Sequence, residues 1–343
     1  MRDAPLHRHI LDRLPDTDEQ TMTSLSRVGI AGVLAAVAAA VIYLAVLSGD
    51  FGGPADNGAS ATGQARAERL FAGLKNSERF KASGGSVSWA HAEALGDEGV
   101  LIRKLSIRGT DWDGRPTAVA AEEIRIRRID WNNVGMSPYG DVEIRGLTAS
   151  NGKIAAFAAA TGVTAFVADL KARWDYKPDT RIADLQTLDL AIREWGTLSA
   201  QGQLHGLDIA ILQEMQKGGE IDPAYVAGLM AGAKIGRLEL SFTDRGAIDR
   251  LAAMRADETG QDKKQVIDQA LAGLAAQRAG QPFGIVRQAY DALIVFVKKR
   301  GTIALKAAPE KPVPLLRLAL TSRSTTAGID RLARELGLSV EAR

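Results

Sequence analysis

The sequence predicts an α+β fold in which a single N-terminal transmembrane helix precedes a β-rich, largely antiparallel periplasmic region with packed helices in its C-terminal third. Three observations predict this class. Residues 28–47 carry no charged side chain, and a helix of that length matches the hydrocarbon core of a bilayer. From residue 84 to 207 apolar and polar residues alternate in short runs, as they do in strands with one buried face. In the C-terminal third, apolar residues recur at helical spacing.

The charges around the apolar run predict how the chain crosses the membrane. Four arginines precede the run, the last of them Arg27, whereas the seventeen residues after Leu47 contain no Lys or Arg. By the positive-inside rule, residues 1–27 are cytoplasmic and the bulk of the chain is periplasmic. A cleaved secretory signal is the alternative, but the leader is long and acidic and lacks a small-x-small site after Leu47. The prediction is a single-pass protein of the bacterial inner membrane.

Small residues recur every four positions on one face of the apolar run, at Gly32, Ala36 and Ala40. This spacing lets two helix backbones approach closely, so it indicates a helix–helix face and a homo-oligomer. The alternative is that the pattern follows from the abundance of alanine in this segment.

A tether and one large folded region follow the apolar run. Residues 48–64 are rich in Gly, Ala, Ser, Asp and Asn and show no hydrophobic period, which is typical of a flexible linker. Residues 65–343 form the predicted α+β region, with a candidate subdivision near 215–235. It begins with a short amphipathic helix around Leu70 to Leu74, after which the apolar period changes from 3.6 to 2.

The strand candidates of this region follow one another as an antiparallel meander. They are separated by Asp-Gly and similar turn signals. The clearest strand is 164–176, in which the apolar and charged side chains fall on opposite faces. The other candidates are 87–90, 100–108, 118–131, 141–149, 182–193, 198–207 and 234–242.

The C-terminal third adds helices. One is predicted at 261–278, and another begins near Pro282 and ends with Lys298, Lys299 and Arg300 in its last turn and Gly301 as the C′ residue. Strands at 302–306 and 313–320 and a last helix ending at 336–337 complete the chain. The pentapeptide Ile-Asp-Arg-Leu-Ala occurs at 248–252 and at 329–333, which indicates a duplicated strand-to-helix unit or a chance match in an Ala-, Arg- and Leu-rich chain.

Composition excludes several classes of function. The 43 basic and 41 acidic residues give a formal net charge of +2, so nothing indicates a nucleic-acid partner. The basic clusters at 103–104 and 125–128 alternate with Ile and Leu, as on the solvated face of strands, with an anionic-lipid patch as the alternative. The chain has no cysteine, which excludes disulfides and thiolate metal sites.

The search for catalytic groups finds no nucleophile elbow, no phosphate-binding glycine loop and no histidine pair at ligand spacing. Asp111 and Asp113 lie in a Thr-Asp-Trp-Asp-Gly-Arg-Pro sequence that is explained as a turn, because Arg115 stands where a calcium loop needs an oxygen ligand. His205 is interpreted as a polar residue at a hairpin, without a partner for general-base chemistry. No catalytic residue, cofactor or metal is predicted.

One apolar strand face is the candidate binding surface. Its side chains are Phe166, Leu170, Trp174 and Tyr176. Such a face lines an acyl-chain groove or belongs to the core, because alternation determines which face is apolar but not what covers it.

The order of elements resembles bacterial envelope proteins of the AsmA group. The residues that carry this resemblance are the stretch from Gly84 to Ala149, especially 121–126, and the C-terminal stretches 300–305 and 309–313. The resemblance implies a role in lipid traffic or outer-membrane assembly. Together with the absent catalytic motifs it favours a binding or scaffold module that holds a lipid or an envelope protein; the alternative is an anchored periplasmic enzyme whose site is assembled from distant residues.

Overall fold

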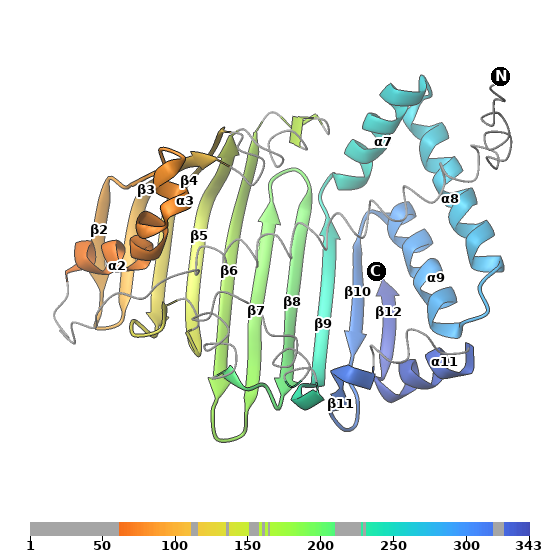
Figure 1. The fold of residues 1–343 in the computed structure, drawn as a ribbon. Helices are drawn as coiled ribbons and strands as arrows, with labels where there is room; N and C mark the ends of the chain where they lie inside the picture. The colour runs from red at the N-terminus through yellow and green to blue at the C-terminus, as the bar shows by residue number, and fades with distance from the viewer. Residues whose placement is uncertain are drawn as a thin grey trace, which may run out of the picture. The chain divides into compact units, whose positions relative to one another are not determined.

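A computed structural model describes residues 62–110, 116–134, 137–150, 158–159, 162–163, 165–209, 228, 231–317 and 326–343. Their strands form one antiparallel sheet in the order β1-β3-β4-β5-β6-β7-β8-β9-β10-β12 (Figure 1). β2 also pairs with β3, and β11 also pairs with β9. From β3 to β10 each strand of this path lies beside the next one along the chain.

The strands of the sheet are long in the middle and short at both edges. β6 and β7, for example, pair over ten residue positions. The strands are β1 Ser86–Ser88, β2 His91–Leu95, β3 Gly99–Thr110, β4 Pro116–Ile129, β5 Tyr139–Ser150, β6 Phe166–Lys177, β7 Ile182–Ile192, β8 Gly196–His205, β9 Lys234–Asp244, β10 Thr302–Ala307, β11 Val313–Pro314 and β12 Leu338–Ala342.

The described helices form two groups that pack near opposite edges of the sheet (Figure 1). The N-terminal group packs against β1, β2 and β3, and in the C-terminal group α9 and α11 pack against β12 and α9 also against β10. The N-terminal helices are α2 Gly63–Asn76 and α3 Glu78–Ala82; the C-terminal ones are α7 Ala247–Thr259, α8 Lys263–Ala279, α9 Gly284–Lys299 and α11 Thr326–Glu335.

The structure corrects the predicted fold class. Within the part of the chain that it describes, no helix is both long enough and apolar enough to span a membrane. The longest of these helices, α8, has 17 residues, and α9 carries Arg287 and Asp291 in its interior, where a charge opposes insertion. The fold is a large antiparallel sheet with helices in its C-terminal part, and the class that included a membrane-spanning helix was wrong. Residues 28–47, where that helix was predicted, lie outside the described residues.

The register of the sheet gives it one apolar and one polar face. A single row of apolar residues crosses nine strands, and the next row, on the opposite face, is mostly charged or polar from β4 to β9. The apolar row is Ile102, Ile124, Ile144, Leu170, Leu190, Leu198, Phe242, Ile303 and Ala342. The row on the other face is Leu101, Arg125, Glu143, Lys171, Asp189, Ser199, Ser241, Ala304 and Glu341.

Helices pack on the sheet near both ends of this row. Phe296 of α9 lies edge-to-face against Phe242 of β9, with 6.0 Å between ring centroids. At the other end, the fully buried Ile102 of β3 lies in the region where α2 packs. The hydrophobic core therefore follows this face of the sheet.

The elements predicted from periodicity agree with the structure within a few residues for most strands and for α8 and α9. Two strands, β2 and β12, were missed. The predicted strand at 313–320 is only the two-residue β11 where the structure describes it, because residues 315–317 are helical. The predicted C′ glycine was also wrong by one position: Arg300 takes the left-handed conformation that ends α9, with φ 56°.

Candidate functional site

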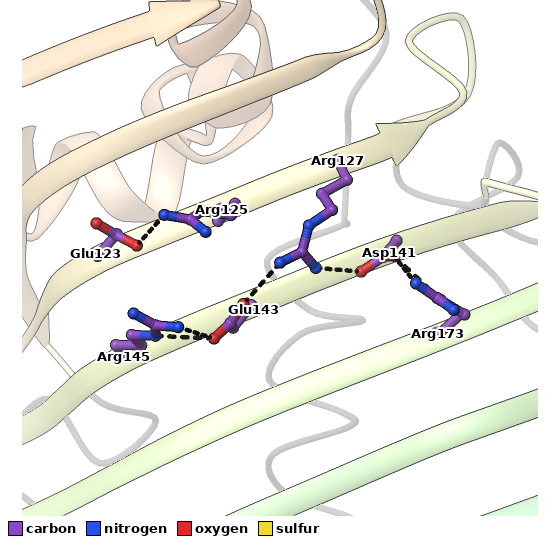
Figure 2. Close-up of polar contacts among 7 residues, drawn as sticks. All are labelled: Glu123, Arg125, Arg127, Asp141, Glu143, Arg145 and Arg173. Carbon is purple, nitrogen blue, oxygen red and sulfur yellow. Dashed lines mark hydrogen bonds and ion pairs between the residues drawn. The ribbon is translucent and has the colours of Figure 1, made fainter. Parts of the chain in front are cut away.

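A group of charged side chains joined by hydrogen bonds and ion pairs lies on the polar face of the sheet, on the adjacent strands β4, β5 and β6. Figure 2 shows seven of these residues and the contacts that join them. They alternate with the buried Ile124, Ile126 and Ile144, so the period of two that builds the core also brings the charges together on the opposite face. The group, called here the β4–β6 ion-pair cluster, consists of Glu123, Arg125, Arg127, Asp141, Glu143, Arg145 and Arg173.

Asp141 is the least exposed carboxylate of this cluster, with 10% of its side chain exposed. Arg127 of β4 donates a hydrogen bond to its Oδ1 over 3.1 Å, and Nε of Arg173 on β6 donates to its Oδ2 over 3.1 Å. Burial alone would raise the pKa of Asp141, but the hydrogen bonds and charges of Arg173 and Arg127 outweigh it, so the pKa is lowered. Asp141 is therefore ionised at neutral pH.

Glu143 is held in a similar way. Arg145 donates to its Oε1 through Nε over 2.8 Å and through Nη2 over 2.6 Å, and Arg127 reaches its Oε2 over 3.2 Å. The hydrogen bond from Arg145 lowers the pKa of Glu143 more than burial raises it. A general acid or base near neutral pH needs a raised carboxyl pKa, so the arrangement is that of structural ion pairs rather than of proton transfer.

The four residues predicted as a groove or core face lie on one face of β6. Leu170 is buried, and Phe166, Trp174 and Tyr176 are half-buried. The Trp174 indole N–H donates to the carbonyl of Ser137 over 2.9 Å, and the Tyr176 hydroxyl donates to the carbonyl of Leu207 over 2.9 Å. Both polar groups are thus satisfied by the protein. Whether this face serves as core or as groove stays a prediction.

The other predicted positions are not brought together. Gly32, Ala36 and Ala40, and also Asp111 and Asp113, lie outside the described residues. His91 lies at the start of β2, with its Nε2 3.5 Å from Glu93, and His205 ends β8. In the part of the chain that the structure describes, no group of three or more His, Cys, Asp or Glu residues could hold a metal ion.

Comparison with protein families gives one match. A family model described as an uncharacterized protein matches residues 189–343, which is less than half of the chain. The matched stretch begins within β7 and includes the helices of the C-terminal group. Comparison with curated proteins finds no match. The resemblance to the AsmA group therefore stays a prediction.

Sequence reasoning missed the acidic half of the ion-pair cluster. The arginines of β4 were interpreted as a solvated strand face, which agrees with their exposure, but their partners on β5 were not named. The alternating Asp141, Glu143 and Arg145 carried that signal, because opposite charges on neighbouring strands of one face pair across the sheet.

Proposed function

We propose that the described region is a binding or scaffold module whose apolar sheet face holds a lipid or an apolar part of an envelope protein. The observation that carries this proposal is the apolar row that crosses nine strands, whereas the described helices that pack on strands do so mainly near the two edges. Between them the row itself is buried at Ile144, Leu170, Leu190 and Leu198. On the same face, Leu188, Leu204 and Leu240 are half-buried, and Leu238 is 38% exposed. A ligand or partner that covers these partly accessible leucines would bury further apolar surface.

The charged groups of the described residues support a binding role over an enzymatic one. The two carboxylates with the clearest shifts, Asp141 and Glu143, have lowered pKa values and arginine partners. Catalytic carboxylates that exchange protons near pH 7 have the opposite shift. The ion-pair cluster is thus suited to fixing the register of β4, β5 and β6 beneath a binding face.

The test compares what copurifies with matched variants of β9. The wild-type chain, Leu238→Glu on the apolar face and Ser241→Glu on the polar face are purified in mild detergent, and bound lipids and proteins are identified by mass spectrometry. A charge on the apolar face opposes contact with an acyl chain or an apolar segment. A lipid or protein held by the wild type and Ser241→Glu but depleted several-fold in Leu238→Glu supports the proposal. Equal amounts in all three contradict it.

A further inference from the structure

Two adjoining cavities lie where strands β6 to β9 meet the start of α7. The first, of about 230 Å³, is lined by the ends of β6, β7 and β8. The second, of about 430 Å³, is lined by the start of α7 and by Lys263, the first residue of α8. Glu194 and Arg245 line both cavities. No residue of the ion-pair cluster lines either cavity.

Three cations at these cavities have no partner among the described residues. Arg193 follows β7, Arg245 precedes α7 and Lys263 begins α8. All three side chains are exposed, and within the described ranges none makes a hydrogen bond or an ion pair. Several cationic side chains elsewhere on the sheet, such as Arg127 and Arg173, are paired.

The acids at the cavities are already engaged. Glu194 is paired with Arg250, and Asp249 is paired with Arg300 over 2.9 Å. Asp169 accepts a hydrogen bond from the backbone N–H of Gly146 over 2.8 Å. Because Arg250 and Arg300 balance two of the three acids, the lining keeps an excess of positive charge.

The N-terminus of α7 adds little to the positive charge of the cavities. The N–H of Ala247 donates to the carbonyl of Trp195 over 3.2 Å, and the N–H of Ile248 donates to Asp244 Oδ1 over 3.2 Å. These backbone donors are used within the protein. A ligand in the cavities would therefore be bound by side chains rather than by these backbone N–H groups.

We propose that the two cavities form one binding site for a phosphate group, held by Arg193, Arg245 and Lys263. Guanidinium groups bind phosphate oxygens through two parallel hydrogen bonds, and lysine adds a compact point charge. The second cavity has room for atoms beyond the phosphate, so the group is either free phosphate or the headgroup of a phospholipid. This inference is independent of the proposed use of the apolar face.

The test measures phosphate affinity by isothermal titration calorimetry on the full chain in uncharged detergent at low salt. The ligands are inorganic phosphate, dihexanoyl phosphatidic acid and, as a zwitterionic control, dihexanoyl phosphatidylcholine. The variants are Arg245→Gln and Lys263→Gln. The matched control is Lys177→Gln, which removes an exposed charge at the opposite end of β6. Thermal unfolding by circular dichroism establishes that each variant is folded.

We expect each site variant to weaken binding about tenfold, the effect of losing one charged hydrogen bond, and Lys177→Gln to leave it within about twofold. Binding of both phosphate ligands identifies free phosphate as sufficient, and binding of phosphatidic acid alone identifies a lipid headgroup; either result supports the site. Absence of binding by both ligands overturns the proposal. An equal loss of affinity in Lys177→Gln overturns it as well, because the attraction would then come from overall charge.

Discussion

At the scale of single residues, Asp141 illustrates how this sheet accommodates charge. It accepts hydrogen bonds from two arginines that come from the strands on either side of its own. Removing one partner of such an ion pair lowers the free energy of unfolding by more than the pair contributes. The remaining charge is still shielded from water but has lost its hydrogen bonds. The carboxylate therefore makes the pairing of β4, β5 and β6 specific as well as stable.

We expect Asp141→Asn to lower the free energy of unfolding at pH 7 by about 2 kcal/mol, the contribution of hydrogen bonds between charged groups. Urea unfolding measures this change. The matched control is Asp189→Asn, since Asp189 is half-exposed on the same face. An equally large loss of unfolding free energy in Asp189→Asn would show that the arginine contacts of Asp141 add no stability of their own.

The same variant has a distinct pH dependence. Because the folded pKa of Asp141 is lowered, its contribution to stability is present above the unfolded pKa of about 4 and disappears as the pH falls through the folded pKa. The wild type should therefore lose stability below about pH 4 more steeply than Asp141→Asn does. Parallel curves of unfolding free energy against pH would contradict the lowered pKa.

At the scale of elements, the docking of α2 depends on one buried cation. Arg66 of α2 is 6% exposed. Its guanidinium donates to the carbonyls of Gly96 over 2.9 Å, Gly99 over 2.6 Å and Asp97 over 2.5 Å, all in the β2–β3 hairpin. A β-carbon at Gly63 would lie 2.2 Å from the backbone of Glu93, so the start of α2 lies directly on β2.

We expect Arg66→Met to lower the free energy of unfolding by about 3 kcal/mol, because it removes the donor to the buried carbonyl of Gly99 and two further hydrogen bonds while keeping most of the side-chain volume. Arg69→Met in the same helix is the control, since the described residues give Arg69 no partner. Hydrogen exchange should show faster exchange in β2 and β3 for Arg66→Met only. Similar exchange in both variants would mean that apolar packing alone holds α2.

At the scale of the whole described region, the sheet is open and continuous from β1 to β12. Its edges are short strands, β1 and β2 at one side and the five-residue β12 at the other. Short edge strands limit pairing with other chains. Truncating the chain between two central strands would instead expose a long strand whose backbone N–H and C=O groups are unpaired along one side.

We expect the fragment 178–343, which begins after β6, to self-associate more than the fragment 62–343. Removing β6 leaves the eleven-residue β7 with unpaired backbone groups and exposes its apolar side chains. Light scattering coupled to size exclusion measures the mass of each fragment. If 178–343 has the same number of copies per particle as 62–343, the C-terminal stretch that contains the family match folds as a unit of its own.

Local periodicity was sufficient to predict most strands. The alternation along 164–176 reports a strand with two unlike faces, and β6 has them. The failures came from short or context-dependent elements: β12 has five residues, and the end of α9 was assigned to Gly301. A β-carbon at Gly301 would lie 2.0 Å from the carbonyl oxygen of Arg343, so that glycine is needed for a close approach that no local pattern reveals.

The two faces of each strand follow from the local sequence, because alternation with a period of two is a property of neighbours along the chain. Which side chains meet across the sheet depends on the tertiary structure. Asp141 lies between Arg127 and Arg173, and Arg193, Arg245 and Lys263 gather at two adjoining cavities. Strand register and helix packing bring these residues together over long separations, and neither is encoded in a local pattern. For the same reason the sequence showed an apolar face without showing that it continues across nine strands.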